Sequence, residues 1–462
     1  MAAKRDRWRE RVDFRVGHTI NEVFMHLPPR AIHEIAAEVA EECVRVGLTY
    51  QEKDGSLRPI PLLLRPRVVT EDQRVYFHKV CLEMTRAVER LARLYVEDAA
   101  IRALLPFSQL EERWLRDLWP RVATEPQTVV ARLDANVDFG SFEWDRDFHF
   151  FETNSVGVGG MHYTPVCEEI ILSRVVPRMR EHAAALSLEP NDDMRVLLLE
   201  QVRDHARAIG RAGAHTCFLQ DLRERGGAME FEQLAAFFAS RGVPAVVGDP
   251  RDLRERGGEI LAGDARVDVF YRDLEIKELA EMESQGDDLS VIKRALERNQ
   301  LVSSISGEFD QKSVFEVLTT PELAARFSKR QQAIFRKHVL WTRIVRETKT
   351  AGPDDETIDL VPFLRRQKDR LVIKPNREFG GTGIVLGPSA DLAEWDAAIA
   401  RALEEPGAWV AQRYVPVHIK DFPVIGEHGI SLEEFYVVVG FLATPRGIGM
   451  LGRCSKRRVV NV

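Results

Sequence analysis

Two short segments carry polar side chains that could bind a metal ion together with a phosphate. The first holds Arg132 and Asp134, and the second holds Glu152 and Asn154. Both segments are rich in β-forming residues, and residues two apart in a strand project from the same face of a sheet. If the strands pair, the carboxylates and the amide oxygen converge beside the arginine. Such oxygen ligands suit a nucleotide-bound Mg²⁺, which takes few carboxylates together with phosphate oxygens.

The same spacing has a simpler explanation. Antiparallel strands often turn one polar face to water, and a cross-strand ion pair there would use the same side chains. Spacing alone favours this exposed hairpin, because polar sheet faces are common. The intervening Asp-Phe-Gly-Ser stretch at residues 138–141 is turn-prone, so a β-hairpin or an adjacent strand pair is expected in either case.

A glycine-rich loop that follows a strand forms the second candidate site. The strand delivers Lys374, and the loop contains Glu378, Gly380, Gly381 and Gly383. Glycines let backbone N–H groups approach an anion, and a lysine held on a strand supplies a point charge. The pattern predicts a phosphate clamp, but not a P-loop, because GxxxxGK[ST] does not occur. A glycine-rich hairpin with a surface lysine explains it about equally well.

A third segment could meet the edge of a heterocyclic base. Gln412, Tyr414 and Val415 lie where a strand leaves through Pro416. Backbone groups in such a connection are accessible to a ligand. The residue types alone do not distinguish this segment from an ordinary strand end.

The elements around these segments indicate an α/β protein with a helical beginning. Amphipathic spacing predicts helices over residues 32–47 and 71–97, so the first 125 residues are expected to be mainly helical. Strands and helices then alternate, which favours a small open α/β domain over residues 194–300. The later elements predicted from local patterns are strands over residues 129–134, 148–152, 195–200, 243–248, 267–271, 370–374 and 408–412 and helices over residues 230–240 and 392–404.

Composition excludes several function classes. A chain of 462 residues exceeds one hydrophobic core, so two to four domains are expected. The net charge of −7 supplies no basic field for nucleic acid. The five scattered cysteines show no CxxC spacing and favour reduced thiols in a cytoplasmic protein. The charged N-terminus and the lack of a long apolar run predict a protein that is neither exported nor embedded in a membrane.

Taken together, Arg132-x-Asp134, Glu152-x-Asn154 and the later Lys-Pro and Gly-Gly-x-Gly motifs resemble the circularly permuted ATP-grasp ligases related to glutathionylspermidine synthase. In that superfamily the metal-binding strands usually come last, whereas here they precede the lysines. The resemblance covers roughly residues 126–462. It implies an ATP-grasp-like α/β fold made of α+β lobes.

The resemblance also implies roles for the acidic and basic residues. Asp134, Glu152 and Asn154 are similar to the family's magnesium ligands. Arg132 resembles the arginine near the transferred phosphate. Arg453 resembles a second arginine near the chain end of permuted members, and we expect both arginines to act in catalysis.

Other positions resemble the nucleotide-binding residues of the family. Lys312 and Lys374 are similar to the two ATP lysines. Residues 378–383 resemble the mobile phosphate-covering loop, and residues 412–415 the adenine-binding hinge. Asn461 resembles the asparagine that follows the late arginine.

The implied activity is an ATP- and Mg²⁺-dependent ligation of a small carboxylic acid to an amine. It would form an amide through an acyl phosphate and release ADP and phosphate. A small-molecule kinase of the same fold and a non-catalytic nucleotide-binding scaffold are the alternatives. No nucleic-acid or membrane partner is expected, and the sequence does not indicate an oligomeric state. The expected units are a helical N-terminal region at 1–125, a catalytic and metal-binding lobe at 126–190, a small α/β domain at 191–305 and a nucleotide-binding lobe at 306–462.

Overall fold

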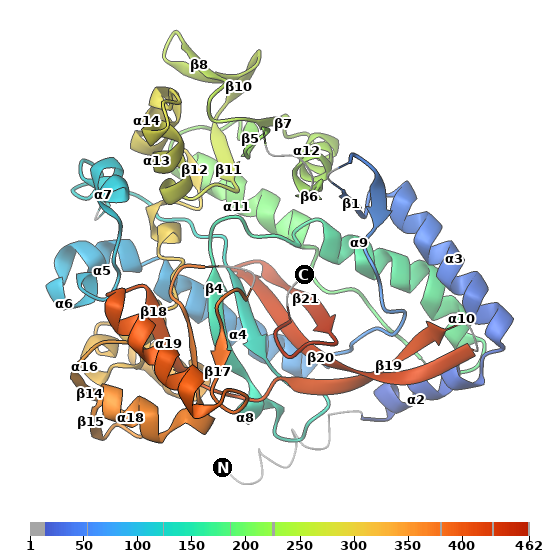
Figure 1. Cartoon of the computed structure of the whole chain (residues 1–462). Coiled ribbons are helices and arrows are strands. Elements are labelled where there is room, and N and C mark those ends of the chain that lie inside the picture. The colour runs from blue at the N-terminus through green and yellow to red at the C-terminus, as the bar shows by residue number, and fades with distance from the viewer. Residues whose placement is uncertain are drawn as a thin grey trace.

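The computed structural model describes residues 14–52, 54–122, 124–184, 186–223, 227–378, 381–426 and 429–460. Helices surround three larger sheets, as Figure 1 shows. One sheet is parallel and the other two are antiparallel. The mixed α/β architecture expected from the sequence is confirmed.

The central antiparallel sheet joins early and late parts of the chain. Its strand order is β19-β20-β3-β4, with β21 also paired to β20. Helix α4 (Glu71–Val88) packs on one face, where the rings of Phe77 and Phe441 lie 5.1 Å apart. The strands are β3 (Arg132–Asn136), β4 (His149–Asn154), β19 (His418–Gly426), β20 (Gly429–Thr444) and β21 (Gly447–Ser455).

The strand pair predicted from the sequence is confirmed. In the antiparallel register of β3 and β4, Asp134 is the partner of Glu152 and Arg132 is the partner of Asn154. A β-bulge follows Asp134, and such a bulge re-aims the side chains beside it. The four polar side chains therefore start from one face of the sheet, opposite the face covered by α4.

A second antiparallel sheet has the order β13-β18-β16-β17. Helices α18 and α19 cover it through an apolar cluster that includes Trp341, Ile373 and Trp395. The expected strands at 370–374 and 408–412 and the helix at 392–404 are confirmed. The elements of this region are β13 (Thr342–Ile344), β14 (Lys349–Ala351), β15 (Thr357–Asp359), α18 (Leu360–Arg366), η3 (Lys368–Arg370), β16 (Leu371–Pro375), β17 (Val385–Leu386), α19 (Leu392–Glu404) and β18 (Trp409–Arg413).

The parallel sheet has the order β12-β11-β5-β7 and forms the upper part of the molecule in Figure 1. The expected strand at 243–248 and the helix at 230–240 are confirmed, and the third expected strand lies at 269–272. The elements are α11 (Met194–Ala208), β5 (Thr216–Leu219), α12 (Glu230–Ser240), β7 (Ala245–Gly248), β8 (Leu253–Arg256), β9 (Glu259–Ala262), β10 (Ala265–Val267), β11 (Val269–Arg272), α13 (Ile276–Ser284), α14 (Ser290–Glu297) and β12 (Leu301–Val302).

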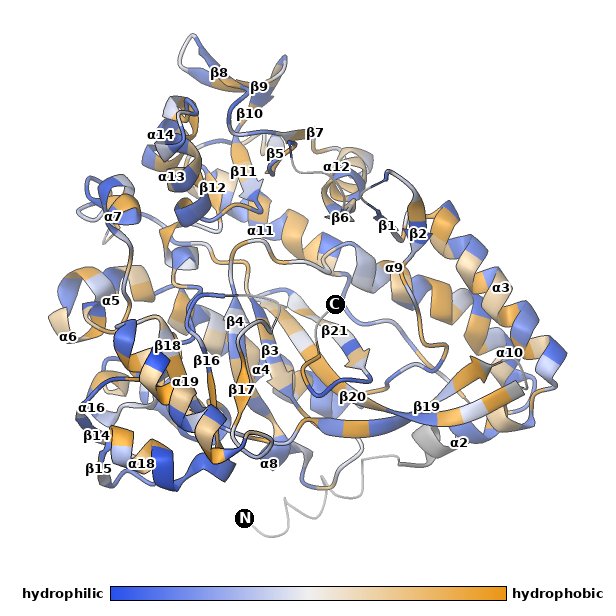
Figure 2. Ribbon diagram, viewed as in Figure 1, coloured by the Kyte–Doolittle hydropathy of each residue, from blue (hydrophilic) through white to orange (hydrophobic). Residues whose placement is uncertain are grey.

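The expected strand at 195–200 is wrong, because these residues lie inside α11. The Asp193 side chain accepts a hydrogen bond from the N–H of Arg195 at 2.9 Å and caps the helix. Leu197, Leu198 and Leu199 are all buried, so this part of the helix is apolar on several sides. Figure 2 shows hydrophobic and hydrophilic residues mixed along α11. A short apolar run cannot be assigned to helix or strand by its period alone.

The long helix expected over residues 71–97 is interrupted. Helix α4 ends at Val88 and α5 (Leu91–Glu97) begins after Arg90. At the break, the carbonyl of Glu89 accepts a hydrogen bond from Ser306 Oγ at 2.8 Å instead of a helical N–H. A tertiary contact therefore ends the helix where the apolar spacing continues.

Of the remaining helices, α2 (Phe14–His26) contacts β19 and β20, and α17 (Lys329–His338) contacts β4. The prediction of a helix near residues 32–47 is confirmed by α3, and the side chains of Ile32, Ile35 and Val39 are buried. Among the described residues, no helix combines the length and the apolar character that crossing a bilayer requires. These elements are α2 (Phe14–His26), α3 (Pro29–Arg45), β1 (Thr49–Gln51), β2 (Leu57–Pro59), α6 (Ala99–Arg102), α7 (Gln109–Leu115), α8 (Trp144–Asp147), α9 (Tyr163–Ile170), η1 (Ile171–Val175), α10 (Val176–Arg180), β6 (Gly227–Ala228), η2 (Ile305–Glu308), α15 (Val314–Thr319), α16 (Pro321–Ala324) and α17 (Lys329–His338).

Candidate active site

A cavity of about 1780 Å³ is lined by residues of the central sheet and of the second antiparallel sheet. Gly383 does not line it, and Gly380 and Asn461 lie outside the described residues. All the other residues singled out from the sequence line the cavity. They are Arg132, Asp134, Glu152, Asn154, Lys312, Lys374, Glu378, Gly381, Gln412, Tyr414, Val415 and Arg453.

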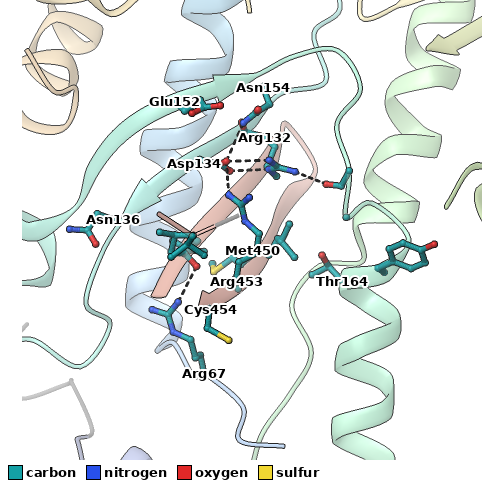
Figure 3. A pocket seen from close by; sticks show the side chains of 18 of the residues that line it. Arg67, Arg132, Asp134, Asn136, Glu152, Asn154, Thr164, Met450, Arg453 and Cys454 are labelled. Atoms are coloured by element: carbon teal, nitrogen blue, oxygen red, sulfur yellow. Dashed lines mark hydrogen bonds and ion pairs between the residues drawn. The ribbon is translucent and has the colours of Figure 1, made fainter. Parts of the chain in front are cut away.

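Asp134 lies at the centre of a hydrogen-bonded cluster in the cavity wall (Figure 3). Arg132 donates to both of its carboxylate oxygens, at 2.9 and 3.2 Å. Arg453, from β21, donates to Oδ2 at 2.6 Å, and the Asn154 amide donates to the same oxygen at 3.2 Å. Arg132 also donates to the carbonyl of Gly159 at 2.9 Å. These contacts fix both guanidinium groups beside the cavity.

The two arginines keep Asp134 ionised despite its burial. Burial alone would raise the pKa of this carboxyl, but the charges and hydrogen bonds of Arg132 and Arg453 outweigh it and lower the pKa below its usual value. Burial would likewise lower the pKa of Arg132, but the attraction of Asp134 raises it. The cluster thus holds one carboxylate between two cations.

Two lysines from different segments approach Glu152. Lys312 places Nζ 3.9 Å from Oε1 of Glu152 and donates to the carbonyl of Glu378 at 2.8 Å. Lys374, on β16, donates to the carbonyl of Phe151 at 2.9 Å. Both lysines are buried. The second sheet therefore delivers an ammonium group to the residue next to Glu152.

Lys374 is the more strongly perturbed lysine. Burial lowers the pKa of its ammonium to about 7, while the negative charge of Glu152 partly opposes this shift and the positive charge of Lys312 adds to it. The described contact of Lys374 with Phe151 is to a neutral carbonyl. A phosphate oxygen would stabilise the charged form of this lysine.

The glycine-rich loop adopts a conformation that needs glycine. Gly381 and Gly383 have φ values of +74° and +75°. A Cβ atom on Gly381 would lie 2.4 Å from Cγ1 of Val459, so the loop packs closely against the last described residues of the chain. The Glu378 side chain is largely exposed, with Lys277 Nζ 3.9 Å from its Oε1. Glu378 thus contacts Lys312 through its backbone carbonyl and not through its side chain.

Gln412 connects the two antiparallel sheets. Its buried amide donates to Thr342 Oγ1 at 2.9 Å and to the carbonyl of Phe151 at 3.4 Å. The N–H of Tyr414 donates to the carbonyl of Arg370 at 2.8 Å. Val415 lines the cavity beside them. The Gln412 amide and the Tyr414 N–H therefore already have partners within the protein.

The residues predicted to bind magnesium share one wall of the cavity. Among the described residues, no group of three or more His, Cys, Asp or Glu side chains is placed to hold a metal ion. Asp134 and Glu152 nevertheless face each other across the strand pair, and Asn154 uses its amide nitrogen for Asp134. Two carboxylates and an amide oxygen fit a Mg²⁺ that takes its other ligands from water and phosphate.

Two buried carboxylates that sequence reasoning missed hold the loop after β4. Asp310 accepts a hydrogen bond from the N–H of Ser155 at 2.6 Å, and Glu230 accepts one each from Gly160 and His162 at 2.9 and 2.6 Å. This loop carries the Gly159 carbonyl that binds Arg132. The local sequence feature that could have drawn attention to this loop is its three glycines between residues 157 and 160.

The chain matches no protein-family model. Uncharacterized proteins of Mycobacterium tuberculosis and Mycobacterium leprae are each 25% identical to it over 463 residues, covering 95% of this chain and 78% and 77% of the relatives. A glutathione synthetase-like effector of Globodera pallida in its apo form superposes with a TM-score of 0.62 at 13% identity, over 95% of this chain and 93% of the effector. The chain therefore shares the fold of a glutathione synthetase-like protein.

Proposed function

We propose that this chain is an ATP-dependent carboxylate–amine ligase of the circularly permuted ATP-grasp kind. The observation that carries the proposal is the convergence of Lys312 and Lys374 on the Asp134–Glu152 strand pair within one cavity. Phosphoryl transfer needs cationic groups around the transferring phosphate and little covalent chemistry from the protein. The shared fold with a glutathione synthetase-like effector supports the same class.

The reaction would proceed in two displacements. A carboxylate oxygen of the acid attacks the γ-phosphorus of ATP, the bond to the β-phosphate oxygen breaks, and ADP leaves. The amine nitrogen then attacks the acyl carbon, phosphate leaves from the tetrahedral intermediate, and the nitrogen loses a proton to give the amide. Arg132 and Arg453, which Asp134 holds at the cavity wall, would stabilise negative charge on the acyl phosphate.

The nucleotide would lie on the lysine side of the cavity. Lys312 and Lys374 would hold its phosphates, and residues 412–415 would contact the base. A Mg²⁺ held by Asp134, Glu152 and Asn154 would neutralise phosphate charge when bound. The loop from Glu378 to Gly383 would cover the phosphates and keep water from the acyl phosphate.

The permuted order is also part of the proposal. Strands β3 and β4 come early in the chain yet pair with β20, which belongs to the last part. This pairing supports an arrangement in which the metal-binding strands precede the lysines. We also propose the four units at residues 1–125, 126–190, 191–305 and 306–462 as the domain division.

ADP release measured with acids and amines, singly and together, tests the ligase. We expect MgATP to raise the melting temperature, and ADP and phosphate to appear only when both substrates are present. Lys374→Met should abolish ADP release and weaken MgATP binding without removing it, whereas Lys329→Met, at an exposed position on α17, should leave both intact.

Other outcomes would identify a different function. ADP release with a single acceptor and a phosphorylated product would identify a small-molecule kinase. A MgATP-dependent rise in melting temperature without turnover over the whole panel would favour a nucleotide-binding scaffold. If MgATP does not bind at all, the proposal is wrong.

A further inference from the structure

Two arginines from the segment between β2 and α4 line the cavity on its other side. Arg65 and Arg67 belong to the N-terminal part of the chain, where the sequence motifs predict no site residue. Arg65 donates to the carbonyl of Asp421 at 2.5 Å, and its guanidinium lies 5.2 Å from the ring centroid of Phe422. Both arginines are half-buried.

Arg67 has only neutral partners among the described residues. It donates to the carbonyls of Val438 and Val137 at 3.3 and 3.4 Å, and its guanidinium lies 4.6 Å from the ring centroid of Phe139. The nearby carboxylate of Asp138 attracts Arg67 but pairs with Lys420, whose Nζ lies 2.7 Å from its Oδ2. No described carboxylate forms an ion pair with Arg67.

A guanidinium without an ion pair in such a place has an energetic cost. Burial lowers the pKa of Arg67 to about 10, so the group stays charged at neutral pH. Partly desolvated charges are normally paired, and Arg65 adds a second positive charge nearby. An anion entering the cavity would meet a planar donor group suited to a carboxylate.

The position of Arg67 separates it from the nucleotide side. Val438, whose carbonyl binds Arg67, is the β-ladder partner of Arg453. Figure 3 shows Asp134 and Arg453 between Arg67 and Glu152, and Lys312 lies near Glu152. A molecule that extends from Arg453 toward Arg67 therefore runs away from the two lysines.

We propose that Arg67 binds a second, non-reacting carboxylate of the acid substrate. The substrate would then be a dicarboxylic acid or a larger acid with two carboxylates. One would react beside Arg132 and Arg453, and the other would be held by Arg67. This assignment rests on the proposed ligase function and adds a substrate class to it.

Equilibrium binding without ATP tests Arg67 separately from catalysis. The probes are the dicarboxylates from succinate to suberate, each compared with its monomethyl ester, in calorimetric titrations of the full chain. We expect one chain length to bind best and its dianion to bind about ten- to a hundredfold more tightly than the ester. Arg67→Gln should remove this preference, and Arg67→Lys should keep part of it.

Arg102→Gln is the matched control. Arg102 also donates to a backbone carbonyl, that of Val96 at 3.4 Å, and lies 5.8 Å from the ring centroid of Tyr95, but it does not line the cavity. Its substitution should leave the preference unchanged. MgATP affinity should be the same in Arg67→Gln and in the wild-type protein.

Two results would overturn the proposal. One is a wild-type protein that shows no preference for the dianion across the series. The other is an Arg67→Gln variant that still prefers the dianion. Even if its melting temperature were lower, Arg67 would then only stabilise the fold by hydrogen bonding to the carbonyls of the sheet. If the wild-type protein prefers the dianion but releases no ADP with any pair of substrates, the ligase function is contradicted and the anion site at Arg67 still stands.

Discussion

Arg453 places Nη2 2.6 Å from Oδ2 of Asp134, a residue 319 positions earlier in the chain. The contact is possible because β20 pairs with β3 on one side and with β21 on the other. Both side chains are largely buried, with 12% and 5% of their surfaces exposed. Asp134 therefore neutralises two arginines in this fold, in addition to its proposed role as a metal ligand.

Replacing Asp134 should destabilise the fold, whereas replacing Glu152 should not. Asp134→Ala leaves Arg132 and Arg453 buried without a carboxylate, and we expect a loss of about 3–5 kcal/mol of unfolding free energy. Glu152→Ala removes a carboxylate that attracts Lys312, 3.9 Å away, and Lys374 but repels Asp310, so these opposing effects should leave the unfolding free energy nearly unchanged. Urea unfolding of both variants measures the difference.

Both variants should lose Mg²⁺-dependent turnover if the proposed ligand set is right.

Asp134 should also make the stability of the protein depend on pH. Its pKa is lowered in the folded state, so its stabilising contribution is present above its unfolded pKa and is lost as the pH falls through its folded pKa. Equal stability of the two variants at pH 7 would contradict the described role of Asp134.

Lys374 should link nucleotide binding to proton uptake. Its pKa in the free protein is lowered to about 7, so at pH 8 most molecules carry a neutral amine. Phosphate oxygens favour the ammonium, and ATP binding at pH 8 should therefore take up nearly one proton, against almost none at pH 6. Calorimetry in buffers of different ionisation enthalpy measures this number.

Lys374→Met should abolish the pH-dependent part of that uptake. The unfolded lysine binds its proton up to about pH 10, so between pH 7 and 10 the unfolded state holds more protons and the folded protein gains stability as the pH rises. The variant should lose this gain, and Lys329→Met should behave as the wild type. Proton uptake that survives in Lys374→Met would assign the effect to another group.

The sequence could predict the strand pair because its signals are local. Alternation and β-forming residues place Asp134 and Glu152 on the same face, and the structure pairs them directly. The contact with Arg453 depends on pairing across most of the chain, which no local pattern encodes. It was the resemblance to a ligase family, and not residue spacing, that pointed to Arg453.

Other parts of the site had weak or misleading sequence signals. Asp310 lies two residues before Lys312 in an unremarkable stretch, yet its burial beside the loop after β4 makes it a support of the site. Gln412 is predicted at a base-binding hinge, and no sequence signal indicated that its side chain also joins two sheets. Such roles arise from tertiary packing, which the local sequence does not contain.

Asp310 should make the protein less stable as the pH rises. Burial raises the pKa of this carboxyl to about 7, and the charge of Glu152 adds to the shift. Between the unfolded pKa of about 4 and pH 7 the folded state holds more protons, so this group's contribution to stability falls across that range. Asp310→Asn should remove the slope. If the melting temperatures of the wild-type protein and of Asp310→Asn change by the same amount between pH 4 and 8, this assignment is wrong.

The contact between Gly381 and Val459 predicts that alanine at residue 381 will weaken ATP binding. Gly381→Ala must adopt a φ near +74° and place Cβ 2.4 Å from Cγ1 of Val459, so the loop has to move. We expect the KM for ATP to rise about tenfold, which corresponds to about 1.4 kcal/mol. Gly55→Ala is the control, because Gly55 has a φ of +88° and open space around its Cβ position. Val459→Ala should restore part of the affinity in the double variant, and no rescue would mean that backbone strain alone causes the defect.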